Sequence, residues 1–325
     1  MLKQKILSPA LVLFFLSPMV GELLSGSSPP AEFFNPVVFL LLAALYGSGA
    51  IIARELTFRW GKGWATLLVL GAAYGIIEEG LMVKSFFDPG WIDLGILGSY
   101  GRWAGINWVW SLQLTIYHTV FSIAIPILLA GLMFPMRQSE PWVSTRTFRK
   151  LCILMVAVVI FGFLFITPYR PPLVHYLLTI IIVSGLIKLA RRLPDTLFIP
   201  KNISVPSSRW FVVAGFLSTF SFFFISWSLP NTGLHPLLTI LLVIGPVILV
   251  SLKVLKMSGN GAAWSKRHQL ALASGALGFF ILLAPLQELD KNRPDNTGGM
   301  TLVGIVAALF LIWMAGRVKE KEENI

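Results

Sequence analysis

The segment WATLLVLGAAYGIIEEGLMVKS, residues 64–85, is an apolar run that contains two adjacent glutamates near its end, Glu78 and Glu79. A helix of about 20 apolar residues crosses the roughly 30 Å hydrocarbon layer of a bilayer. We therefore predict that residues 64–85 form a membrane-spanning helix. The two carboxylates inside this helix are the first candidates for a functional site.

Apolar runs of this length recur along the whole chain. Its 325 residues are 56% hydrophobic and 13% charged, whereas a soluble domain normally has about 25% charged residues. No polar stretch is long enough to form a separate soluble domain. We predict an all-α, polytopic transmembrane helical bundle in a single membrane domain, residues 1–325, with about ten spans near 6–24, 37–53, 64–85, 109–134, 151–167, 172–189, 210–228, 236–254, 269–286 and 300–316.

The basic residues lie mainly in one of the two sets of loops that alternate between these spans. This set includes both ends of the chain, with Lys3, Lys5, Lys319 and Lys321. Of the 26 Lys and Arg residues, the other set holds only Lys84, Arg102, Arg170, Lys291 and Arg293. Because positively charged loops stay in the cytoplasm, we predict that both termini are cytoplasmic. The net charge of +11 then reflects topology and contact with the lipid bilayer, and we expect no nucleic-acid partner.

We expect an integral protein of a prokaryotic plasma membrane. Residues 1–31 resemble a signal peptide in their basic start and small-residue end, but the apolar run is long and contains Glu22. This favours an uncleaved first span. The single Cys152 excludes an internal disulfide.

Two segments of the chain repeat each other. The sequence HYLLTIIIVSG at 175–185 matches HPLLTILLVIG at 235–245. We predict that residues 149–189 and 209–254 are two copies of one hairpin. Parallel repeats occur in transporters, but duplicated hairpins are also purely architectural, and we favour the architectural interpretation.

The connection 88–107 combines several glycines with Trp91, Tyr100 and Trp103. Trp and Tyr favour the headgroup zone of a membrane. As a lid, this connection would cover a site; as an aromatic belt, it would only anchor the protein at the surface. We favour the belt.

Glu78 and Glu79 give the strongest functional signal. Each ionised carboxylate at mid-membrane costs about 2.5–3.5 kcal/mol, so the pair needs a partner. Gly71, Gly75 and Glu79 share one helical face, and small residues there let another helix approach. The next span runs antiparallel and brings His118 to a similar depth, so we predict that His118 is the first partner. Other polar groups toward the same side of the membrane are Glu22, His175 and His235.

Carboxylate and imidazole groups at one depth have two chemical uses. They can bind a divalent metal such as zinc, with one glutamate left to accept a proton from water. They can also relay protons or bind another cation.

The order of these residues resembles the CPBP family of intramembrane proteases, which includes the CAAX prenyl endopeptidases and the bacterial Abi proteins. That family has a glutamate pair in one span, a histidine in the next, and a later His-x-x-x-Asn. Here Glu78-Glu79, His118 and His175-x-x-x-Thr179 match this order. An arginine and a phenylalanine accompany the family's motifs, and Val83 and Leu114 stand at those positions.

The resemblance implies metal-assisted peptide hydrolysis within the membrane. Glu78 or Glu79 would be the catalytic base, and the metal ligands would be Glu79, His118, His175 and Thr179. We therefore expect a CPBP-like peptidase that uses a divalent metal and acts on a membrane-embedded or lipidated peptide. Two alternatives remain open: a transporter or proton-coupled carrier that uses the Glu78/Glu79 pair, and a non-catalytic membrane subunit.

Overall fold

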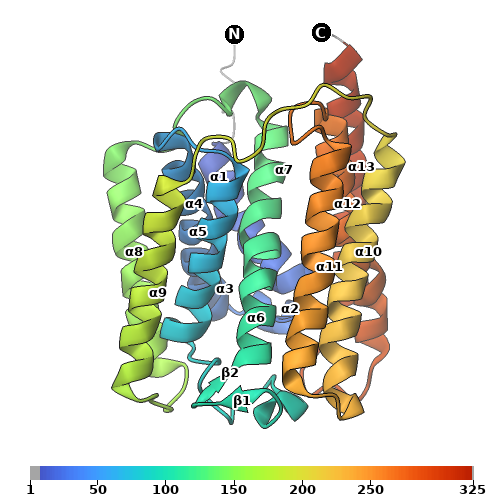
Figure 1. Cartoon of the computed structure of the whole chain (residues 1–325). Coiled ribbons are helices and arrows are strands. Elements are labelled where there is room, and N and C mark those ends of the chain that lie inside the picture. The colour runs from blue at the N-terminus through green and yellow to red at the C-terminus, as the bar shows by residue number, and fades with distance from the viewer. Residues whose placement is uncertain (1–7, 324–325) are drawn as a thin grey trace.

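A computed structural model describes residues 8–323, with side chains for residues 8–318. In this part of the chain, nine helical stretches are long and apolar enough to cross a membrane, and a shorter apolar stretch covers Pro9–Leu24. The predicted polytopic helical bundle is confirmed (Figure 1). Several predicted features lie outside the described residues or side chains, namely Lys3, Lys5, the first two residues of the span 6–24, Lys319 and Lys321.

Several of the N-terminal spans combine α-helical and π-helical turns. Up to the short hairpin of strands, the elements are α1 (Pro9–Pro18), η1 (Met19–Leu24), α2 (Pro30–Phe33), α3 (Pro36–Leu42), η2 (Ala43–Gly47), α4 (Ser48–Arg59), α5 (Trp64–Ile76), η3 (Ile77–Met82), η4 (Gly95–Gly98), β1 (Arg102–Trp103) and β2 (Ile106–Asn107). The two strands pair antiparallel.

The C-terminal elements are mostly long, regular helices. They are α6 (Trp108–Tyr117), η5 (His118–Ala124), α7 (Ile125–Met133), η6 (Pro135–Arg137), α8 (Thr145–Phe165), α9 (Leu173–Arg192), α10 (Ser208–Ser228), η7 (Leu229–Thr232), α11 (Pro236–Met257), α12 (Lys266–Leu289) and α13 (Met300–Glu323).

The bundle has two distinct ends. The first described helix begins and the last one ends at the same end of the bundle (Figure 1), which we name the terminal face. The β1–β2 hairpin lies at the opposite end, which we name the hairpin face. That the terminal face is cytoplasmic stays a prediction from the charge pattern.

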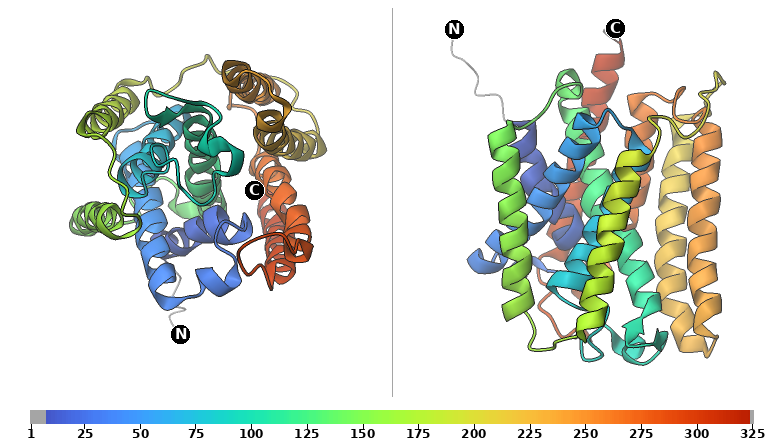
Figure 2. Two further views of the ribbon diagram at one scale, coloured as in Figure 1. Left: turned by 90° about the horizontal axis from the view of Figure 1, so that it is seen from below. Right: turned by 60° about the vertical axis from the view of Figure 1, so that its left-hand side comes forward.

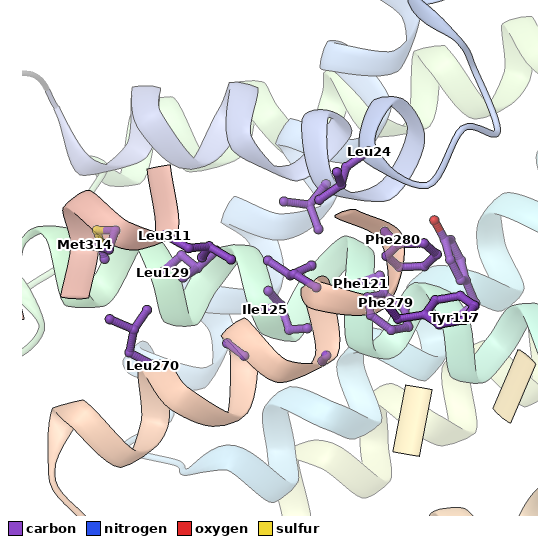
Figure 3. Close-up of a cluster of buried hydrophobic side chains, with 14 of the residues drawn as sticks. Leu24, Tyr117, Phe121, Ile125, Leu129, Leu270, Phe279, Phe280, Leu311 and Met314 are labelled. Carbon is purple, nitrogen blue, oxygen red and sulfur yellow. The ribbon is translucent and has the colours of Figure 1, made fainter. Parts of the chain in front are cut away.

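The most buried spans are central. The windows in Trp64–Met82 and Trp108–Met133 are 61% and 67% buried, whereas those in α8, α9 and α11 are 17%, 17% and 11% buried. One large core cluster joins the α6–α7 span to α12 and α13: Tyr117, Phe121, Ile125 and Leu129 face Leu270, Phe279, Phe280, Leu311 and Met314 (Figure 3). The apolar outer faces of the peripheral helices suit a lipid environment.

The two segments that the sequence predicts to be copies of one hairpin attach differently to this centre. Seen from the hairpin face, α8–α9 and α10–α11 lie on different sides of the central helices (Figure 2). Helices α10 and α11 pack on each other, while α8 packs mainly on α4, η2 and η3, and α9 on α5 and η3. Matching positions are nevertheless buried in both copies: Thr179 and Val183 in α9, and Thr239 and Val243 in α11.

A buried ion-pair network fixes α4 near the terminal face. Glu55, which is 0% exposed, lies 2.7 Å from Arg54 and 3.0 Å from Arg59, and it accepts a hydrogen bond of 2.8 Å from the Trp142 backbone. Arg54 also donates to the carbonyl oxygens of Gln138 and Glu140 at 3.0 and 2.7 Å. The polar groups of this network are therefore paired, and they tie α4 to the connection that precedes α8.

Candidate functional site

Glu78, Glu79 and His118 come together inside the hairpin-face half of the bundle. Nε2 of His118 lies 2.9 Å from Oε1 of Glu79, and Nδ1 lies 3.2 Å from Oε2 of Glu78. The three side chains are buried, and one ligand atom from each lies within 4.8 Å of the others. These three residues form the group that we name the acidic cluster.

Two glycines allow this close approach. A Cβ atom on Gly75 would lie 3.0 Å from Cβ of His118, and one on Gly71 would lie 3.1 Å from Cα of Thr119. The span that carries the glutamates and the span that carries the histidine therefore meet at their small residues, in agreement with the spacing of Gly71, Gly75 and Glu79. This contact sets the distance between Glu79 and His118.

Neighbouring hydroxyl groups fix the orientation of the cluster. Nδ1 of His118 lies 3.0 Å from Oγ of Ser122. Ser85 donates a hydrogen bond to Oε2 of Glu79, and Ser85 in turn accepts from the Trp110 indole at 3.0 Å. Glu79 is thus held on both of its oxygens.

A third carboxylate, Glu22, lies beside the cluster. It accepts hydrogen bonds from the Tyr46 hydroxyl and from Oγ of Ser28 at 3.0 Å. The Tyr46 and Tyr74 rings lie 6.0 and 6.1 Å from the His118 ring, centroid to centroid. Glu22 is partly exposed, whereas the acidic cluster is buried.

One oxygen of the cluster lacks a hydrogen-bond partner. Oε2 of Glu78 lies 3.2 Å from Nδ1 of His118, but it has no hydrogen-bond partner among the described residues. The same holds for the buried hydroxyl of Tyr74. Leaving a buried polar group unpaired costs about 1–3 kcal/mol, and more for a charged one. These two groups therefore mark a place where a further ligand would be stabilised.

The cluster also carries an excess of negative charge. Within residues 8–318, no Lys or Arg forms an ion pair with Glu78 or Glu79. The nearest lysine in sequence, Lys84, donates instead to the carbonyl oxygens of Phe163 and Thr167 at 2.8 and 2.9 Å. Buried charges need compensation, so two or three carboxylates around one imidazole call for protons or a bound cation.

The polar side chains of the site lie on π-helical turns. Glu22 is in η1, Tyr46 in η2, the glutamate pair in η3, and His118 in η5. A π-helical turn is rare and occurs frequently at functional sites. Four such turns from four segments of the chain meet here, which indicates that this region is built for binding or chemistry.

His175 and Thr179 do not join the acidic cluster. Nε2 of His175 lies 2.9 Å from the carbonyl oxygen of Ala104, and Oγ1 of Thr179 donates to the His175 carbonyl at 2.7 Å. Thr179 presents its methyl group to η3, 3.0 Å from where a Cβ of Gly80 would lie. Their imidazole and hydroxyl groups are thus hydrogen-bonded to backbone carbonyl oxygens and not to the acidic cluster. The remaining histidine of that face, His235, accepts from the Leu237 backbone at the start of α11.

The connection between η3 and α6 folds over the hairpin-face side of the cluster. Its residues Phe86, Phe87, Leu94 and Leu97 form a small core with Val109 and Trp110. The Tyr100 hydroxyl donates to the Leu234 carbonyl at 2.9 Å. Trp103 and Trp108 stack on each other and remain 41% and 39% exposed. The connection thus has a buried covering part as well as exposed aromatic rings of the kind expected for a belt.

Sequence reasoning missed Tyr46 and Tyr74 as members of the site. Together with Tyr117, whose ring lies 5.2 Å from His118, they are three of the six tyrosines in the chain. Tyrosine in a membrane span favours the headgroup zone. A tyrosine in the middle of an apolar run is therefore unusual, and this position was the sequence signal that could have identified these residues.

Comparison with known proteins corrects the family assignment. A search of curated proteins and a search of solved structures give no match. A family model described as an uncharacterized membrane protein family matches residues 11–315, and this family is different from CPBP. The resemblance to CPBP proteases is therefore wrong: ionisable residues inside a membrane pair with one another in proteins of many kinds, and Val83, Leu114 and Thr179 already broke the pattern. The chain belongs to this uncharacterized membrane protein family.

Proposed function

We propose that this membrane protein is a metal-dependent enzyme whose acidic cluster binds a divalent cation. The observation that carries the proposal is the geometry of Glu78, Glu79 and His118, whose ligand atoms lie within 4.8 Å of one another in a buried position. Carboxylate oxygens and imidazole nitrogens both bind zinc, and catalytic zinc sites use three protein ligands and keep the fourth position open.

The surrounding contacts support different roles for the two glutamates. Glu79 is held by Ser85 and His118, so Glu79 and His118 are the oriented ligands. Glu78 retains an oxygen without a hydrogen bond, which suits a third ligand or a group that accepts a proton. A divalent ion at this position would polarise a water molecule or a carbonyl group, which supports hydrolysis as the reaction class. Because the cluster is buried among helices that are long enough to span a membrane, a molecule within the bilayer is the substrate.

Metal analysis of the purified protein tests this proposal. We expect close to one divalent metal per chain, and loss of most of it in Glu79→Gln and in His118→Ala. Asp195→Asn is the matched control, because Asp195 is an exposed carboxylate that pairs with Lys62. Native-like metal content in both cluster variants would overturn the proposal.

A proton-coupled carrier is the second candidate. Hydrogen bonds join Tyr46, Glu22 and Ser28 beside the cluster, and such a chain can conduct protons. Toward the terminal face, however, Leu13, Ile51 and Leu70 pack into a core, and the paired Arg54–Glu55 network follows. This arrangement favours a site that a ligand reaches from the hairpin face, rather than a proton pathway that continues to the terminal face.

The two candidates differ in a direct measurement. A carrier would acidify or alkalise the lumen of proteoliposomes during transport and would lose this activity in Glu78→Gln. The metal enzyme leaves the lumen pH unchanged, whatever metal is bound. Measurement of lumen pH with a trapped dye therefore separates them.

A further inference from the structure

Three tyrosine rings pack around His118 of the acidic cluster. The ring centroids of Tyr46, Tyr74 and Tyr117 lie 6.0, 6.1 and 5.2 Å from the His118 centroid. The Tyr46 hydroxyl donates a hydrogen bond to Glu22, and the Tyr117 hydroxyl donates to a backbone carbonyl of η1. The Tyr74 hydroxyl is buried and has no hydrogen-bond partner among the described residues. Tyr74 therefore holds a donor that this part of the chain leaves unused.

The ring of Tyr74 is held in a fixed position. Tyr74 is 3% exposed, and its ring lies 5.9 Å from that of Tyr46. A Cβ atom on Gly49 of α4 would overlap Cε2 and Cδ2 of Tyr74, so the missing side chain at Gly49 makes room for the ring. A donor that is fixed in this way needs no reorganisation when charge develops on an oxygen beside it.

The second unused group is an acceptor on the same helical face. Glu78 follows Tyr74 by four residues, so both side chains project from one face of their span. Oε2 of Glu78 lies 3.2 Å from Nδ1 of His118, but it has no hydrogen-bond partner in the part of the chain that the structure describes. One free donor and one free acceptor thus adjoin the same imidazole.

The hydrolysis of an acyl group uses such a pair of groups. The carbonyl oxygen gains negative charge in the transition state and is stabilised by a fixed hydrogen-bond donor. The attacking water loses a proton to a general base. The Tyr74 hydroxyl has the polarity that the first task requires, and the free oxygen of Glu78 has the polarity that the second requires.

The charge of the site favours an uncharged substrate. Within residues 8–318, the ion pairs of Glu78 and Glu79 are with His118 and with no Lys or Arg. Glu22 adds a third carboxylate beside the cluster. One divalent cation would balance two of these carboxylates, which leaves no positive charge to balance a phosphate group. Unbalanced like charges reject an anionic ligand, whereas a neutral carbonyl group avoids this cost.

We propose that the site takes a neutral ester or amide within the bilayer, whose carbonyl oxygen accepts a hydrogen bond from Tyr74 while Glu78 accepts the proton of the attacking water. This inference rests on the proposed metal site, and it adds the substrate class and a catalytic residue. Phosphate esters are excluded as substrates.

The step balances with these two side chains. The water oxygen forms a bond to the carbonyl carbon, its proton passes to Glu78, and one electron pair of the C=O bond moves to the oxygen that Tyr74 contacts. When this pair forms the C=O bond again, the C–O bond of the ester or the C–N bond of the amide breaks. Glu78 then returns the proton to the leaving oxygen or nitrogen. Tyr74 keeps its proton throughout.

The test compares two probes that have the same chain and different head groups. Dodecanohydroxamic acid carries a neutral carbonyl group, and dodecyl phosphate carries a charged one. Both are titrated by calorimetry into protein that has been incubated with Zn²⁺ in nanodiscs, and the zinc content is measured in the same samples. We expect the native protein to bind the hydroxamic acid more tightly than the phosphate.

Two tyrosine variants make the test specific. In Tyr74→Phe, we expect the affinity for the hydroxamic acid to fall about 2- to 10-fold, the effect of one lost hydrogen bond. The zinc content and the melting temperature should stay native, because Tyr74 loses no hydrogen bond within the described chain. Tyr176→Phe is the matched control. The Tyr176 hydroxyl is also buried without a partner among the described residues, but its ring packs on Phe163, so this variant should bind as the native protein does.

The outcomes separate this inference from the metal site. Native affinity for the hydroxamic acid in zinc-loaded Tyr74→Phe, or an equal loss in Tyr176→Phe, would overturn the role of Tyr74. Zinc-loaded native protein that prefers dodecyl phosphate, or that binds neither probe, would overturn the substrate class and leave the metal site intact. Native protein that binds no zinc would overturn the metal site and this inference together.

Discussion

Two buried groups of charged side chains within residues 8–318 differ in how their charges are balanced. Near the terminal face, Glu55 is surrounded by Arg54, Arg59 and a backbone amide. In the acidic cluster, Glu78 and Glu79 share one imidazole, and one carboxylate oxygen has no hydrogen bond. A fully paired network holds helices together, whereas an incompletely paired one can bind a ligand. Removing a charge from the first group should therefore lower stability, whereas removing one from the second should abolish function and leave stability nearly unchanged.

The largest effect on stability is expected at the paired network. Glu55→Ala leaves Arg54 buried without its carboxylate partner, and breaking a buried pair in this way costs about 3–5 kcal/mol. Unfolding in detergent, followed by circular dichroism, measures the loss. Asp195→Ala, which removes an exposed pair, should cost less than about 1 kcal/mol. Equal costs for the two variants would contradict the structural role of Glu55.

A smaller effect is expected where the glutamate span meets the histidine span. In Gly75→Ala, the added Cβ lies 3.0 Å from Cβ of His118, and overpacking costs about 1–3 kcal/mol. Metal binding should weaken as well, because His118 moves. Gly185→Ala in α9 is the matched control, since nothing lies within 4 Å of its Cβ, and this change should be neutral or slightly stabilising. Full metal affinity in Gly75→Ala would show that the contact does not position His118.

The acidic cluster itself should contribute little to stability. Glu78→Gln changes an oxygen that makes no hydrogen bond and removes a charge that no Lys or Arg in the described part of the chain balances. We expect a change of less than about 1 kcal/mol in the free energy of unfolding, together with loss of function. The same unfolding assay measures it, and destabilisation as large as that of Glu55→Ala would remove the distinction between the two groups.

A different effect, on the pH dependence of stability, is expected at Lys84, which follows the glutamate pair in the sequence. Burial lowers the pKa of Lys84 to about 8, and Arg170 contributes. In the unfolded chain the pKa of lysine is about 10.4, so between these values the unfolded state binds more protons and stability rises with pH. Lys84→Met should remove this rise between about pH 8 and pH 10. If the free energy of unfolding of Lys84→Met rose with pH as in the native protein, Lys84 would not be the source of this rise.

The sequence predicted the spans and the meeting of two helices, and it did so for physical reasons. Apolar runs of span length are a direct consequence of bilayer thickness. The spacing of Gly71, Gly75 and Glu79 indicated the contact face, and that face does meet the span of His118. The π-helical turns could not be predicted, because one extra residue per turn leaves no pattern in a uniformly apolar segment.

The rest of the site depends on tertiary packing. His175 and Thr179 have the helical spacing of a ligand pair, but spacing fixes only their shared face, and α9 presents the Thr179 methyl group to η3. Glu22 was recognised at a suitable depth, yet its contacts with Tyr46 and Ser28 join segments whose neighbourhood no local pattern encodes. The roles of all these residues remain predictions.

X-ray absorption spectroscopy of the metal-loaded protein is the sharpest test of a cation bound by Glu78, Glu79 and His118. We expect a first shell of nitrogen and oxygen ligands at about 2.0–2.2 Å, with the scattering pattern of a single imidazole that disappears in His118→Ala. A shell without imidazole, or a spectrum that is the same in the native protein and in His118→Ala, would contradict it.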